Sequence, residues 1–69
     1  MVEVFKTNVH DEEKSKVLLE KLLFHFPGIK INFDLEDFDN VLRVEGNHIL
    51  PDKIMELLNR EGHQCEILD

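Results

Sequence analysis

Residues 29–35 read Ile29-Lys30-Ile31-Asn32-Phe33-Asp34-Leu35, and this stretch alternates strictly between apolar and polar side chains. A period of two places all the apolar side chains on one face of a β-strand and all the polar ones on the other. Such a pattern is typical of an antiparallel strand with one buried face and one face in water. It argues against an all-helical fold, which needs apolar residues three and four positions apart.

A second strand is expected at residues 41–45, with Leu42 and Val44 pointing inward. The segment Asp37-Phe38-Asp39-Asn40 predicts the turn that joins the two strands into a hairpin, and Gly46-Asn47 predicts the end of the hairpin. Two further strands are expected near the ends of the chain, at residues 2–9 and 63–68.

A first helix is predicted between the first strand and the hairpin. Asp11 is a plausible N-cap, and the acidic residues after it suit the positive end of a helix dipole. Pro27-Gly28 predicts the end of this helix. The apolar residues at helical spacing are Val17, Leu18, Leu19, Leu22, Leu23 and Phe26.

A second helix is predicted after the hairpin, with Pro51 in its first turn and Gly62 just beyond its end. Its apolar stripe consists of Ile54, Met55, Leu57 and Leu58. The complete order is strand, helix, strand, strand, helix, strand. We therefore expect a single α+β domain over residues 1–69, a ferredoxin-like βαββαβ sandwich with two helices on one face of a four-stranded antiparallel sheet.

Charge and hydropathy exclude several classes of function. The formal net charge is −7, which repels phosphate backbones, so we expect no nucleic acid partner. No apolar run approaches the roughly 20 residues of a membrane span, so no membrane insertion is expected. The first residues lack the features of a secretory signal peptide, which predicts a cytoplasmic protein.

The chain has one cysteine, Cys65. A disulfide within the chain is therefore excluded, as is any metal site built from two cysteines of one chain. On the last predicted strand, Cys65 is expected to be a small buried side chain rather than a ligand.

Several segments, taken in order, resemble the heavy-metal-associated domain family. These segments are Phe5-Lys6-Thr7-Asn8-Val9, Pro27-Gly28-Ile29, Val41-Leu42-Arg43-Val44-Glu45-Gly46 and Glu61-Gly62-His63. The family includes copper chaperones and the soluble domains of metal-transporting ATPases. The resemblance covers nearly the whole chain and implies the same βαββαβ fold.

The family's metal motif, Gly-Met-x-Cys-x-x-Cys, is where this sequence departs from the pattern. The resemblance places Asp11 at the first cysteine and Lys14 at the second. A protonated lysine has no lone pair for a metal, and soft Cu(I) prefers thiolates. Copper transfer through a pair of thiolates is therefore not expected of this chain.

Two interpretations of the altered loop remain. In this fold the turn after the second helix lies beside the loop before the first helix, which places His63 near His10 and Asp11. Those three residues are candidate ligands for Zn(II), Ni(II), Cu(II) or Co(II). In the simpler interpretation Asp11 caps the helix and both histidines are solvated.

The expected function is that of a non-enzymatic binding module, with a protein partner and a role in interaction or regulation within a metal-handling context. The sequence contains neither a recognisable pairing of a nucleophile with a base nor a glycine-rich phosphate loop, so we do not expect an enzyme. Divalent metal binding at His10, Asp11 and His63 is the alternative. A small-molecule sensor that binds its ligand at a dimer interface is a third interpretation. We expect a monomer or a weak dimer.

Overall fold

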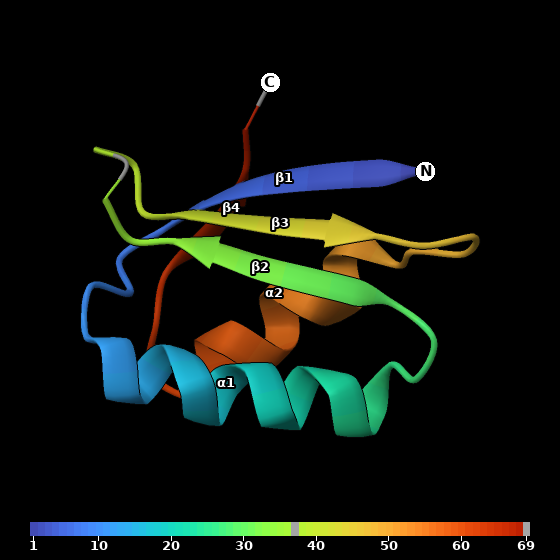
Figure 1. The fold of residues 1–69 in the computed structure, drawn as a ribbon, viewed down its shortest axis with the longest axis horizontal. Coiled ribbons are helices and arrows are strands. Elements are labelled where there is room, and N and C mark those ends of the chain that lie inside the picture. The colour runs from blue at the N-terminus through green and yellow to red at the C-terminus, as the bar shows by residue number, and fades with distance from the viewer. Residues whose placement is uncertain (37, 69) are drawn as a thin grey trace.

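In the computed structural model, which describes residues 1–36 and 38–68, two helices lie against one face of an antiparallel sheet (Figure 1). The elements in chain order are β1 (Val2–Thr7), α1 (Glu12–His25), β2 (Lys30–Asp34), β3 (Val41–Glu45), α2 (Pro51–Arg60) and β4 (Cys65–Ile67). The strand order is β2-β3-β1-β4, so β2 and β4 are the edges. The predicted ferredoxin-like α+β fold is confirmed. The predicted turn at 37–40 includes Asp37, which lies outside the described residues.

The register of the strands creates one apolar face. Phe5 of β1 lies opposite Leu42 of β3, and Leu42 lies opposite Phe33 of β2. Directly opposed residues in antiparallel strands point to the same side, so these side chains form a row beneath the helices. Phe5 and Leu42 are fully buried, and Phe33 is half-buried because β2 is an edge strand.

The first strand ends at Thr7, two residues earlier than expected. The Thr7 hydroxyl donates to the Asn40 carbonyl oxygen at 2.6 Å and accepts from the Val9 amide at 3.2 Å. The bond to Val9 is of the local side-chain-to-backbone kind that competes with the strand ladder. The bond to Asn40 reaches the residue just before β3, and together the two bonds engage Thr7 where β1 ends. Val9 is still buried, with 1% of its surface exposed, as the tail of the apolar pattern predicts.

Helix α1 buries a narrower stripe than its sequence suggests. Leu18 and Leu22 are buried, and Leu19 is half-buried. Val17 and Leu23, which belong to the predicted apolar set, are 51% and 45% exposed. A helix that packs on a flat sheet turns only about a third of its circumference toward the sheet, so residues at the margins of its apolar stripe stay in contact with water.

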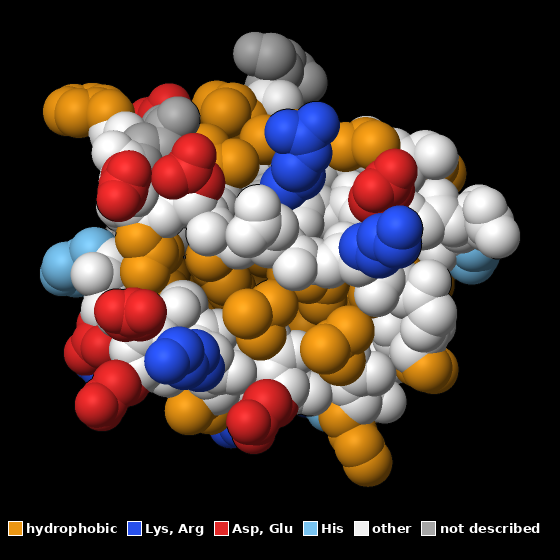
Figure 2. Space-filling model, in the orientation of Figure 1, with side chains coloured by type: hydrophobic (Ala, Val, Ile, Leu, Met, Phe, Trp, Pro, Cys, Tyr) orange, Lys and Arg blue, Asp and Glu red, His pale blue; other side chains and the backbone are white. Residues whose placement is uncertain are grey.

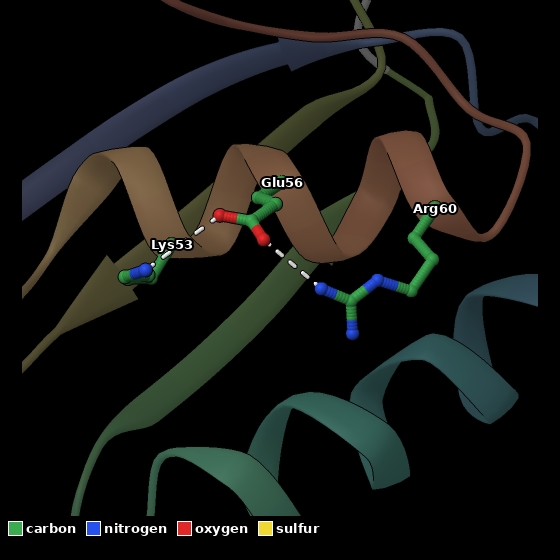
Figure 3. A network of polar contacts seen from close by, with 3 residues as sticks. All are labelled: Lys53, Glu56 and Arg60. Atoms are coloured by element: carbon green, nitrogen blue, oxygen red, sulfur yellow. Dashed lines mark hydrogen bonds and ion pairs between the residues drawn. The ribbon is translucent and has the colours of Figure 1, made fainter.

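Helix α2 begins at Pro51, without a side-chain cap, and Gly62 follows its end with φ of 89°. That backbone conformation is open to glycine and strained for other residues, so the predicted stop is confirmed. On the solvent side of α2, Glu56 lies between two cations (Figure 3): Lys53 Nζ is 3.7 Å and Arg60 Nη2 is 3.0 Å from its carboxylate oxygens. Such exposed pairs contribute only a few tenths of a kcal/mol each, about 0.3–0.5.

In the described part of the chain, no helix covers the other face of the sheet (Figure 1). That face carries Val2, Val4, Val41 and Arg43, and Val4 lies opposite Arg43. Val2 is 46% exposed, whereas Val4 and Val41 are half-buried. None of the helices in the described part of the chain has the length and hydropathy needed to cross a membrane.

Adjacent leucines of α1 provide a direct test of this packing. Leu22 has no exposed surface, whereas Leu23 is 45% exposed. We expect Leu22→Ala to lower the free energy of unfolding by about 2–5 kcal/mol, because it removes buried contacts and leaves a cavity. Leu23→Ala should change it by no more than about 0.5 kcal/mol.

Urea denaturation followed by circular dichroism measures both values. A 69-residue domain has a total stability of roughly 3–10 kcal/mol, so the loss expected for the Leu22 variant is a large part of the total. Equal losses for the two variants would contradict the orientation of α1 on the sheet.

Candidate functional site

The loop between β1 and α1 is tied to the turn after α2 by a single asparagine. The side-chain oxygen of Asn8 accepts from the Gln64 amide at 2.8 Å, and the Asn8 amide donates to the Gln64 carbonyl oxygen at 3.4 Å. These bonds bring two segments that are 56 positions apart in sequence side by side. The neighbourhood of the two loops, expected from the resemblance, therefore exists in the structure.

Asp11 caps helix α1. Its Oδ1 accepts from the Glu13 amide at 2.8 Å and from the Lys14 amide at 3.4 Å. These amides have no partner within the helix, and a carboxylate there also complements the helix dipole. A cap of this kind contributes about 1 kcal/mol. The capping role predicted for Asp11 is confirmed.

The two candidate histidines, His10 and His63, belong to the two loops that meet beside this cap. The His10 Nδ1 is 2.9 Å from the Asn8 carbonyl oxygen. A carbonyl oxygen only accepts, so Nδ1 carries the proton in this bond and Nε2 is left as the open ring nitrogen. His63 is half-buried, and its amide donates to the Leu58 carbonyl oxygen at 2.9 Å.

Two adjoining depressions occupy this end of the domain, and together we call them the loop-end hollow. One has a volume of about 450 Å³ and is lined by Asp11, Glu13, Lys14, Val17, Leu18, Glu61, Gly62 and His63. The other, of about 520 Å³, is lined by Asn8, His10, Asp11, Lys14, Gly62 and His63. The three sequence-predicted ligands therefore line a common hollow.

Lining a hollow is a weaker condition than ligating an ion. Among residues 1–36 and 38–68, no three His, Cys, Asp or Glu side chains are grouped so that they could hold a metal ion. Lys14 lies in the same hollow, and its ammonium repels a cation. Asp11 is engaged by two helix amides. The metal site at His10, Asp11 and His63 stays a prediction.

Cys65 cannot replace the missing thiolates. It is a free, buried cysteine on β4, opposite Thr7 of β1. The predicted burial of this side chain is confirmed. Burial, reinforced by the charge of Glu66, raises the pKa of its thiol from 9.0 to about 12. With this pKa, the side chain remains a neutral thiol at physiological pH. Because the thiolate is the form that binds metals, the Cys65 side chain does not act as a metal ligand. The described residues do not fit a thiolate copper centre.

An ion pair between Lys21 and Glu61 joins the middle of α1 to the end of α2 beside the hollow. Neither this ion pair nor the role of Asn8 is predictable from the sequence. Neither Lys21 nor Asn8 belongs to a motif. The partner of Lys21, Glu61, lies 40 positions away in the chain, and the partner of Asn8, Gln64, lies 56 positions away. The fold alone brings these partners together.

No family model matches the sequence, and no curated protein matches it either. The likeness to heavy-metal-associated domains therefore stays an interpretation of the residues and of the fold.

Proposed function

We propose that this chain is a non-enzymatic, cytoplasmic protein-interaction module that docks its partner over the loop-end hollow. It would correspond to a heavy-metal-associated-like domain in which the metal loop has become a docking surface. The metal-handling context comes from the resemblance alone. The observation that supports the proposal is a hollow lined by a helix cap, Asp11, and an ammonium, Lys14, with an exposed apolar side chain beside them. The resemblance places cysteines at these two positions.

That apolar side chain is Val17. It is 51% exposed and lies next to the buried Leu18 on the wall of the hollow. The lining also includes the charged Glu13, Lys14 and Glu61. Protein interfaces usually combine apolar and charged side chains in this way. With a net charge of −7, the chain favours a partner with an apolar anchor flanked by basic groups.

Site-specific photo-crosslinking tests this docking surface. A benzoylphenylalanine at position 17, in the hollow, is compared with one at position 50, where Leu50 is similarly exposed at 46% but precedes α2. We expect a discrete adduct from position 17 in a cell extract and none of that mass from position 50.

Competition makes the test specific. Excess unlabelled wild-type chain and the Leu50→Asp variant should both suppress the adduct, because each retains an intact hollow. The Val17→Asp variant should not suppress it, since a carboxylate replaces the apolar side chain. Equal suppression by Leu50→Asp and Val17→Asp, or equal adducts from both positions, would count against docking at the hollow.

Divalent metal binding is the second candidate function. It is favoured by two observations: His10, Asp11 and His63 line a common hollow, and the carbonyl bond of His10 leaves Nε2 open. A metal-binding histidine usually donates its other ring nitrogen in this way. The hollow would then take Zn(II), Ni(II), Cu(II) or Co(II) through nitrogen and oxygen ligands.

A titration followed by ¹H–¹⁵N NMR separates the two functions. For a docking module, we expect Zn(II), Ni(II) and Co(II) to cause only weak, unsaturated shifts up to millimolar metal. Stoichiometric shifts confined to residues 8–14 and 62–65 would instead establish the metal site. In that case His10→Asn and His63→Asn should abolish them, and the matched variants His25→Asn and His48→Asn, at histidines outside the hollow, should leave them unchanged.

A further inference from the structure

The outer edge of β2 is open in the described part of the chain. β2 ends the sheet order and pairs only with β3. An open edge leaves a row of backbone donors and acceptors available to another strand. Natural proteins commonly protect such an edge with charged side chains, and β2 carries two, Lys30 and Asp34.

The arrangement of those charges makes β2 complementary to itself. In an antiparallel pair, facing residues share a side of the sheet, so the numbers of two facing residues must both be even or both be odd. With Asn32 facing Asn32 of a second copy, Lys30 faces Asp34 of that copy, and Asp34 faces its Lys30. All five residues of Lys30–Asp34 are then paired.

The neighbouring registers lose this match. With residue 31 facing itself, Lys30 faces Asn32 and Asp34 faces Gly28. With residue 33 facing itself, Lys30 faces Glu36, which lies beyond the end of β2. Opposite charges directly across strands stabilise a pair, and like charges destabilise it, so the register centred on Asn32 is selected.

The adjacent strand extends the alternation of charge. Within one copy, Lys30 already lies opposite Glu45 of β3, and Asn32 lies opposite Arg43. In the joined sheet a row would therefore run from Glu45 to Lys30 to Asp34 of the second copy, with the sign alternating at each step. No like charges face each other across the seam.

The helix side of the seam carries apolar side chains flanked by charged ones. A groove of about 450 Å³ runs between α1 and β2; Leu19, Phe33 and Leu35 line it together with the charged Glu12, Lys16 and Glu36. The three apolar residues are half-buried, and Figure 2 shows apolar side chains exposed in a band between β2 and α1, with charged ones on either side. Pairing across β2 would bring the grooves of two copies together and cover this band.

We propose that β2 is a homodimerisation edge, at which two copies pair antiparallel about Asn32 to form a continuous eight-stranded sheet. The interface is short, since β2 has five residues, and interfaces of small area belong to weak, concentration-dependent complexes. This inference is independent of docking at the loop-end hollow, which β2 does not line.

Two single charge reversals test both the interface and its register. Lys30→Asp alone and Asp34→Lys alone each place like charges across the seam twice, so each variant should raise the dimer dissociation constant by about tenfold or more. An equimolar mixture of the two variants places opposite charges at both positions. The mixture should therefore dimerise as well as the wild type does.

Sedimentation equilibrium from micromolar to millimolar chain measures these constants, and ¹H–¹⁵N spectra verify that each variant is folded. Isotope-filtered NOEs between copies of the wild type should connect residues 31–33 to residues 31–33. The matched controls are Lys53→Asp and Asp52→Lys, which make the same charge changes on exposed α2 positions. They should leave dimerisation unchanged.

The net charge alone predicts a different pattern. Asp34→Lys brings the net charge of −7 closer to zero, so a non-specific association would be strengthened by it and equally by Asp52→Lys. That result would overturn the proposal, as would a wild type that stays monomeric at millimolar concentration. The proposal would also be overturned if the mixed variants failed to associate. It would be overturned likewise if the domain stayed monomeric and β2 paired with a strand of another protein.

Discussion

The structure depends on one constraint: a four-stranded sheet whose apolar face must be removed from water by two short helices. The row formed by Phe5, Leu42 and Phe33 fixes the register of three strands at once, because a slip by one residue would turn each of those side chains into solvent. Leu22 of α1 and Leu58 of α2, both with no exposed surface, close this face from the other side. In so small a domain, each such side chain supplies a large share of the core.

The sequence could predict what is encoded locally. The alternation at residues 29–35, the stop at Pro27-Gly28 and the positive φ of Gly62 each follow from a few adjacent residues, and together they predict the order of elements. The end of β1 could not be predicted, because it depends on a bond from Thr7 to Asn40 across the sheet. The exposure of Val17 could not be predicted either, since the width of the buried stripe depends on how α1 lies on the sheet. For the site, the sequence predicted Asp11 at a helix start, and the fold implied by the resemblance predicted His63 near it. The link through Asn8 and Gln64 emerges only from the structure.

These features place two surfaces on different parts of one small domain. The loop-end hollow lies where α1 begins and α2 ends, and its chemistry is dominated by a capped helix terminus. The β2 edge offers a strand whose charges match its own copy. A dimer through β2 would present two hollows to partners, so that weak binding at each hollow could be strengthened through multivalency.

The decisive measurement for the role of Asp11 is the free energy of unfolding of wild type, Asp11→Asn and Asp11→Ala, each with and without Zn(II). For a helix cap we expect a loss of about 1 kcal/mol for Asp11→Ala and little loss for Asp11→Asn, because an asparagine oxygen caps equally well, and Zn(II) should change none of the three values. Stabilisation of the wild type by Zn(II) that both variants abolish alike would show instead that Asp11 is a metal ligand.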